Sequence, residues 1–177
     1  TGSLSLAELA SSSGALAPTN LPLLTAVVLI VAGLLFKLGV VPFHMWVPDV
    51  YDGSATSTTL FLSSVPKLAA FAIMLRLLAY GLGEWVSAWQ DMLAIAAVLS
   101  ISVGNIVAIA QTSLKRMLGY STISHMGFLL LGFLGGTAHG YSASLSYVVI
   151  YTVITLGAFG IILLLSKPQF EFDALSD

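Results

Sequence analysis

Long apolar runs are the feature that most constrains this chain. A helix that crosses a hydrocarbon core of about 30 Å needs roughly 20 mostly apolar residues, and the sequence contains several such runs between short polar stretches. A membrane β-barrel would need segments of about 10 residues with alternating apolar and polar side chains, whereas these runs are apolar on both faces. We therefore predict an all-α, polytopic transmembrane bundle. Its spans are expected near residues 21–46, 59–80, 91–111, 117–135 and 143–166.

The composition agrees with an integral membrane protein. Of the 177 residues, 58% are hydrophobic and only 8% are charged, whereas soluble domains carry about 25% charged residues. The absence of a basic tract interleaved with aromatic residues excludes nucleic acid as a partner and leaves the lipid bilayer. Because there is no cysteine, the chain has no disulfide, thiolate metal site or iron–sulfur ligation. We expect no redox centre, bound cofactor or metal in this chain.

Polar segments flank the predicted bundle. We expect residues 1–20 to be a connecting segment and residues 167–177 to be a polar loop. The start has neither a methionine nor the basic and apolar regions of a signal peptide. The expectation is therefore that this sequence is an internal fragment of a longer protein.

The basic residues outside the spans predict the orientation. Lys115 and Arg116 lie in the loop at 111–117, which alternating spans place on the same side as Lys167. Cytoplasmic loops carry an excess of lysine and arginine. We therefore predict that the loop at 111–117 is cytoplasmic.

Three titratable side chains fall near the middle of predicted spans. At a rise of 1.5 Å per residue, Lys37 lies about 5 Å and Lys67 about 4 Å from mid-depth, and His125 lies near the middle of the fourth span. A charge at this depth costs about 2.5–3.5 kcal/mol on insertion scales and is tolerated mainly beside a polar interior. Burial favours the neutral form of lysine, which allows proton exchange, and histidine exchanges protons near neutral pH. We interpret these three residues as a proton relay.

Structural roles stay open for these residues. The amine of Lys37 could instead extend towards the cytoplasmic side, past the break at Pro42. His125 could simply hydrogen-bond a neighbouring helix. Lys67 has less opportunity to reach water, because it lies deep in a span with weakly polar neighbours.

A predicted helix break follows Lys37. Pro42 has no amide hydrogen and its ring clashes with the carbonyl four residues earlier, so the first span is expected to be discontinuous near Pro42. Broken helices are tolerated at membrane depth only where protein or water satisfies the freed backbone groups, and transporters place them next to ion sites. An ordinary proline kink is the alternative. His44, Ser124 and Tyr151 are further candidates for a polar axis or its entry.

Three stretches carry a family resemblance: "FKLGVVPFHMWVPDVYDGSAT", "SSVPKLAAFAIMLRLL" and "NIVAIAQTSLKRMLGYSTISHMGFLLLG". They closely resemble the subunit N family of bacterial respiratory complex I, the NADH–quinone oxidoreductase, which is similar to Mrp-type cation/proton antiporter subunits. The motifs come in the same order with similar spacing, and the resemblance covers essentially the whole chain. It implies part of an antiporter-like fold of two inverted repeats.

The resemblance also implies a function. The chain would be part of a proton-translocating membrane-arm subunit of this translocase in the bacterial inner (plasma) membrane, with the other membrane-arm subunits as partners. NADH, FMN, iron–sulfur clusters and quinone would act in other subunits. By resemblance, Lys37 and Lys67 belong to a proton-translocating row, and His125 lies on or near the central polar axis. The alternatives are an Mrp-type antiporter subunit, a membrane-bound hydrogenase subunit, or a structural membrane subunit that transports nothing.

Overall fold

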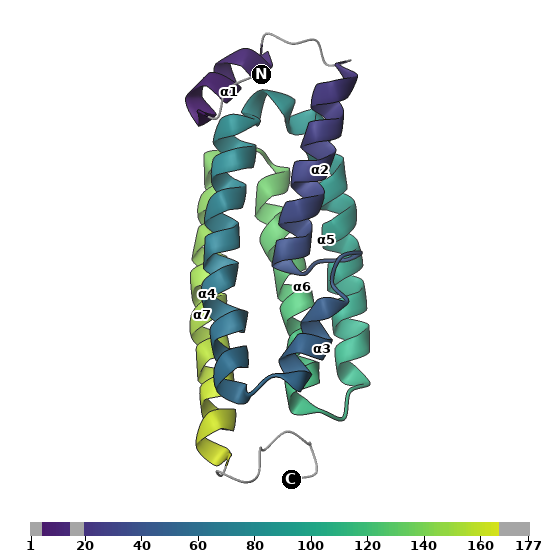
Figure 1. The fold of residues 1–177 in the computed structure, drawn as a ribbon, viewed down its shortest axis with the longest axis vertical. Coiled ribbons are helices and arrows are strands. Elements are labelled where there is room, and N and C mark those ends of the chain that lie inside the picture. Colours follow the sequence, from purple (N-terminus) through teal and green to yellow (C-terminus); the bar gives the residue numbers. More distant parts are fainter. Residues whose placement is uncertain (1–4, 15–19, 167–177) are drawn as a thin grey trace.

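The structure is a computed structural model that describes residues 5–14 and 20–166, which form helices joined by short connections (Figure 1). No strand occurs within these two ranges. The helices are α1 (Leu6–Gly14), α2 (Leu21–Leu38), α3 (Trp46–Gly53), α4 (Thr56–Met74), α5 (Val86–Ile109), α6 (Leu114–Leu134) and α7 (Ala138–Leu165). A π-helical stretch, Leu75–Gly81, extends α4, and a short 3₁₀ turn, Gly83–Trp85, precedes α5.

The predicted all-α fold class with five membrane spans is confirmed. Among the residues that the structure describes, five helices are long and apolar enough to cross a membrane, by length and composition. They are Leu21–Leu38, Thr56–Gly81, Gly83–Ile109, Leu114–Leu134 and Ala138–Leu165. The third span starts well before the predicted residue 91, because the 3₁₀ turn and the first turns of α5 continue the helix.

The first residues add a short helix to this bundle. Part of the segment expected to connect, Leu6–Gly14, is the helix α1. α1 packs against the π-helical end of α4, where Leu6 and Leu9 approach Gly81. The loop expected at 167–177, with the Lys167 used to predict the orientation, lies outside the described residues.

The first span is discontinuous, as predicted, and a glycine cap ends its first half. Gly39 has a left-handed φ of 76°. The N–H of Val40 donates to the Leu35 carbonyl at 3.1 Å, and the N–H of Gly39 donates to the Phe36 carbonyl at 3.0 Å. This pair of bonds is the Schellman motif, which favours glycine because a Cβ is disfavoured at positive φ. α2 therefore ends at Leu38, inside the span.

The chain then resumes as α3, which packs against α4 and α6 in the lower half of the bundle (Figure 1). Side chains from elsewhere in the protein satisfy backbone groups that the break frees. The Val41 N–H donates to Ser100 Oγ on α5 at 2.9 Å, and the Trp46 indole N–H donates to the Phe36 carbonyl at 3.1 Å. Protein contacts of this kind are what make an irregular backbone tolerable at membrane depth.

Small residues let α5 and α6 pack closely. A Cβ added at Gly104 would lie 2.6 Å from the backbone nitrogen of Ser124, and one added at Gly127 would lie 2.9 Å from the Ala97 carbonyl oxygen. Close backbone approach through small residues is a common way to pack transmembrane helices. This contact fixes the face that α6 turns towards the interior.

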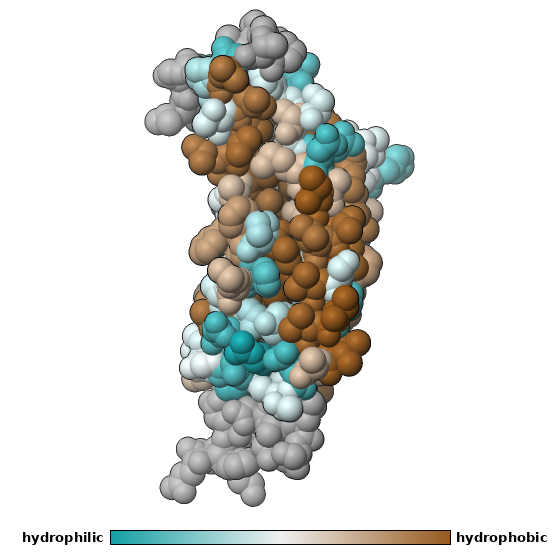
Figure 2. Space-filling model, turned by 90° about the vertical axis from the view of Figure 1, so that its right-hand side faces the viewer, coloured by the Kyte–Doolittle hydropathy of each residue, from teal (hydrophilic) through white to brown (hydrophobic). Residues whose placement is uncertain are grey.

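The outer surface of the bundle is largely apolar. Figure 2 shows hydrophobic residues along one flank, with more hydrophilic residues gathered towards an end. Large apolar side chains such as Ile106 (70% exposed) and Leu164 (85% exposed) point outward. Outward-facing apolar side chains suit a lipid environment, in which hydrocarbon replaces water.

We predict that Gly104→Ala lowers the stability of the full-length protein by about 1–3 kcal/mol, the usual effect of overpacking. The added methyl group would overlap the α6 backbone at Ser124. Gly157→Ala on α7 is the matched control, because nothing lies within 4 Å of its added Cβ. The measurement is thermal unfolding in detergent. Equal midpoints for the two variants would contradict the packing described for Gly104.

We also predict that Gly39→Ala destabilises the helix break. A left-handed φ costs an alanine about 1–2 kcal/mol, and its Cβ would lie 2.3 Å from a methyl carbon of Val47. Gly136→Ala is the control, since Gly136 also has a positive φ (57°) but its added Cβ would lie 3.6 Å from the nearest atom, on Val86. Thermal unfolding should show the larger loss for Gly39→Ala, and a larger loss for Gly136→Ala would refute the clash.

Candidate proton-transfer site

Lys67 lies at the break and is the centre of the site. Its side chain projects from α4 and is only 1% exposed. Its amine donates to the Leu38 carbonyl at 2.6 Å, and Leu38 is the last residue of α2 before the Schellman glycine. The last carbonyls of a helix have no partner within it. The interruption of the first span therefore supplies the acceptor for the buried lysine.

The remaining surroundings of Lys67 are mostly apolar. The amine lies 5.1 Å from the centre of the Trp46 ring, a cation–π distance. Within residues 5–14 and 20–166, the ion pairs found join Arg116 to aspartates and none involves Lys67. An isolated buried charge is costly and is usually neutralised or paired. Lys67 can donate to Leu38 in either protonation state, so it can lose or gain a proton without losing this bond.

Tyr151 connects the lysine helix to the histidine helix. Its hydroxyl lies 2.9 Å from Thr122 Oγ1 on α6 and 3.4 Å from the Ser63 carbonyl on α4. A phenol has one hydrogen, so it donates to one of these acceptors at a time. Ser63 precedes Lys67 by four residues, which is one helical turn or about 6 Å along the axis. Rotation of one buried hydroxyl therefore changes the side towards which the proton points.

His125 lies on the other side of Tyr151. The two rings are 5.4 Å apart between centroids, and His125 Nδ1 is 2.7 Å from the Tyr147 hydroxyl. Tyr147 and Tyr151 are four residues apart on α7, so they share a face. His125 and Thr122 are three residues apart on α6 and also share a face. The helices α6 and α7 thus meet through a row of hydroxyl and imidazole groups, which we call the proton-transfer row. Its members are Thr122, His125, Tyr147 and Tyr151.

A small cavity opens beside this row. Its volume is about 50 Å³, and a single buried water needs roughly 10–15 Å³ measured in the same way. The polar groups that line it are Ser121, Thr122, His125, Tyr151 and Thr155. This space is large and polar enough for water that bridges hydroxyl and imidazole groups, so the arrangement can pass protons between neighbouring groups.

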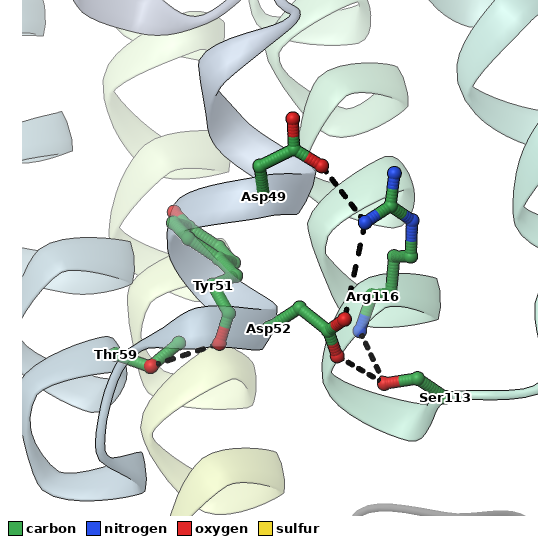
Figure 3. A network of polar contacts seen from close by, with 6 residues as sticks. All are labelled: Asp49, Tyr51, Asp52, Thr59, Ser113 and Arg116. Atoms are coloured by element: carbon green, nitrogen blue, oxygen red, sulfur yellow. Dashed lines mark hydrogen bonds and ion pairs between the residues drawn. The ribbon is translucent and has the colours of Figure 1, made fainter.

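An ion-pair cluster holds the short helix α3 in place (Figure 3). Arg116 at the start of α6 contacts Asp49 at 2.8 Å and Asp52 at 3.8 Å. The Ser113 hydroxyl donates to Asp52. On the opposite side of α3, the Thr59 hydroxyl of α4 donates to the backbone carbonyl of Tyr51 at 3.1 Å. The two aspartates thus tie α3 to α6.

Tyr51 is a site residue that sequence reasoning missed. It is 0% exposed and its ring packs edge-on against Phe159 at 5.9 Å between centroids. The ring also packs beside Gly119 on α6, where an added Cβ would lie 3.6 Å from Tyr51 Cδ2, and the hydroxyl completes no hydrogen bond with any described residue. Leaving a buried hydroxyl unsatisfied costs about 1–3 kcal/mol. No periodic signal in the sequence could have found it, because α3 spans only two turns.

The other residues singled out from the sequence fall in different places. Lys37 is on an exposed face of the last turn of α2, so this chain does not bury it with Lys67. His44 lies in the break, and its Nδ1 is buried without a hydrogen-bond partner among the described residues. Ser124 turns to α5, where it accepts a hydrogen bond from Asn105 at 2.8 Å. Of the candidates singled out from the sequence, His125 and Tyr151 belong to the row between α6 and α7. Lys67 lies on α4, the helix whose Ser63 carbonyl Tyr151 reaches.

Comparison with known proteins identifies relatives over the full chain. A family model described as "NADH:quinone oxidoreductase/Mrp antiporter, TM" matches residues 1–177. NADH-quinone oxidoreductase subunit N of Thiobacillus denitrificans is 58% identical over 177 residues, and that of Coxiella burnetii is 48% identical over 178 residues. Both alignments cover 100% of this chain but 37% of the relative. The chain therefore spans little more than a third of the length of these relatives.

Two solved structures share the fold. One is respiratory complex I from Thermus thermophilus with bound aureothin, at 40% identity and a TM-score of 0.68, covering 83% of this chain and 32% of that chain. The other is the Mrp complex from Dietzia sp. DQ12-45-1b, at 22% identity and a TM-score of 0.78, covering 90% and 29%. The second likeness shows the fold alone. Together with the family match over every residue, these findings show that the chain belongs to the NADH:quinone oxidoreductase/Mrp antiporter transmembrane family.

Proposed function

We propose that this chain is the proton-transferring part of a membrane-arm subunit of a respiratory NADH–quinone oxidoreductase. The observation that carries the proposal is the buried amine of Lys67, bonded to the carbonyl that the helix break frees. A buried lysine that has no carboxylate partner among the described residues is suited to exchange protons, because burial favours its neutral form. The relatives named NADH-quinone oxidoreductase subunit N support the assignment to this complex.

The polar row next to Lys67 gives the proton a route. The Tyr151 hydroxyl reaches the Ser63 carbonyl on the lysine helix in one orientation and Thr122 beside His125 in the other. The Ser63 carbonyl only orients the Tyr151 hydroxyl and carries no proton. Transfer between this hydroxyl and the Lys67 amine, one helical turn or about 6 Å further along α4, requires a water molecule or movement of the flexible lysine side chain. His125 then exchanges protons with water in the adjoining cavity. In this proposal Lys67 and His125 are the two titrating ends of a hydroxyl relay.

The role of Lys37 in this proposal depends on parts of the full-length protein outside this chain. It belongs to the last turn of α2, next to the carbonyl that Lys67 occupies, but it faces outward. We infer that parts of the full-length protein outside these 177 residues cover that face and supply the acid that pairs with Lys37. His44 in the break is a candidate entry group on the same side.

We also propose how this chain works within the whole complex. The redox chemistry, with NADH, FMN, iron–sulfur clusters and quinone, takes place in other subunits. Quinone reduction there drives charge and hydration changes along the membrane arm, and the other membrane-arm subunits are the partners of this chain. The location is the bacterial inner membrane, with residues 111–117 on the cytoplasmic side. Protons then move from the cytoplasm outward.

Lys67→Ala in the full-length subunit tests the proposal. We expect the complex to assemble, while protons pumped per electron fall by at least about tenfold, in line with the loss of a proton-transfer group. The measurement is acidification of inverted membrane vesicles with simultaneous quinone reduction. Assembly is checked on the same membranes.

Met74→Ala is the matched control. Met74 is also on α4, is 0% exposed and has a long unbranched side chain, so its loss creates a comparable cavity without removing a titratable group. The control should keep its pumping ratio. A normal ratio for Lys67→Ala in an assembled complex would refute the relay and favour a structural role for the lysine.

A further inference from the structure

The hydroxyl of Tyr51 is the buried polar group that the proton-transfer row leaves unexplained. It belongs to α3, the half-helix after the break, whereas the row is built from α4, α6 and α7. Its ring is fixed by the edge-on contact with Phe159, which also lines the cavity next to His125. The short helix α3 therefore places the Tyr51 ring against a residue that borders the cavity beside the row.

Thr122 has a free acceptor position for this hydroxyl. The Thr122 hydroxyl uses its own hydrogen to donate to the Leu118 carbonyl at 2.9 Å, and it accepts one hydrogen bond from Tyr151 at 2.9 Å. A hydroxyl oxygen accepts two hydrogen bonds. Among the described residues, no other donor takes the second position. The Tyr51 ring packs beside Gly119, which is three residues before Thr122 and on the same face of α6.

We propose that Tyr51 is a positioning residue for the proton-transfer row, whose hydroxyl donates to Thr122 and thereby sets the direction in which Tyr151 donates. Two donors on one oxygen compete for its electron density. When Tyr51 donates to Thr122, the Tyr151 hydroxyl turns more readily to its alternative acceptor, the Ser63 carbonyl on the lysine helix. This inference rests on the proposed function, since it specifies how that row is directed.

The contacts of α3 with α4 and α6 determine where the Tyr51 hydroxyl lies. Asp49 and Asp52, on either side of Tyr51 in the chain, are held by Arg116, and Thr59 holds the backbone carbonyl of Tyr51 itself (Figure 3). At Gly119, an added Cβ would lie 3.1 Å from the Cα of Pro48, so α3 sits directly against α6. Any displacement of α3 therefore moves the Tyr51 hydroxyl relative to Thr122.

The test uses Tyr51→Phe and Tyr51→Leu in the full-length subunit within its complex. Tyr51→Phe removes only the hydroxyl, whereas Tyr51→Leu also removes the ring. We expect Tyr51→Phe to assemble and to lower protons pumped per electron by at least about twofold, because a misdirected donor slows transfer. Tyr141→Phe is the control: Tyr141 is a partly buried tyrosine that packs against Phe133, away from the row. It should keep the wild-type ratio.

The two substitutions separate a positioning role from packing. A wild-type ratio for Tyr51→Phe with a lowered ratio for Tyr51→Leu means that only the ring matters, and it overturns the proposal. If Tyr51→Phe fails to assemble, Tyr51→His decides, because it keeps a ring and a hydrogen-bond donor at this position. A ratio for Tyr51→His above that of Tyr51→Leu supports the proposal, and a ratio equal to that of Tyr51→Leu overturns it.

Including Lys67→Ala in the same series distinguishes a failure of the proposed function from a failure of the role of Tyr51. If Lys67→Ala pumps normally, the proposed function itself fails. If Lys67→Ala loses pumping while Tyr51→Phe keeps it, the relay stands and only the role of Tyr51 is wrong.

Discussion

The hydrogen bond from the Lys67 amine to the Leu38 carbonyl joins the two unusual features of this chain. A helix break at membrane depth leaves carbonyls without partners, and a buried lysine needs an acceptor. Each feature meets the requirement of the other, at a distance of 2.6 Å and with the lysine 1% exposed. The glycine cap at Gly39 makes this pairing possible, because it ends α2 at Leu38, and the absence of a Cβ at Gly39 leaves room for the amine.

The break also creates α3, and α3 relates the end of the bundle to its interior. On one face, its aspartates pair with Arg116 of α6, and on another the Tyr51 ring packs against Phe159 of α7. An uninterrupted helix could not present these groups to α6 in this way, because its axis would continue along α2. The family model that matches residues 1–177 places this arrangement in the NADH:quinone oxidoreductase/Mrp antiporter transmembrane family.

The sequence predicted the fold class well, because span length and apolar composition depend only on the bilayer. It also predicted a break near Pro42, which lies between the end of α2 at Leu38 and the start of α3 at Trp46. It could not predict that Lys37 faces outward, since depth along a helix does not determine which face a side chain occupies. The ion pairs of Asp49 and Asp52 and the burial of Tyr51 depend on how α3 turns after the break, and a helix of eight residues carries too little periodicity to reveal it.

The central claim is that Lys67 exchanges protons and does more than supply a buried positive charge. Proton pumping by the assembled complex with Lys67→Arg tests this most directly, because arginine keeps the charge and the donors but does not release its proton in proteins. If Lys67 exchanges protons, we expect the Lys67→Arg complex to assemble normally and to lose most of its proton pumping. Pumping at the wild-type ratio with an arginine at this position would show that a fixed charge suffices, and it would contradict proton exchange at Lys67.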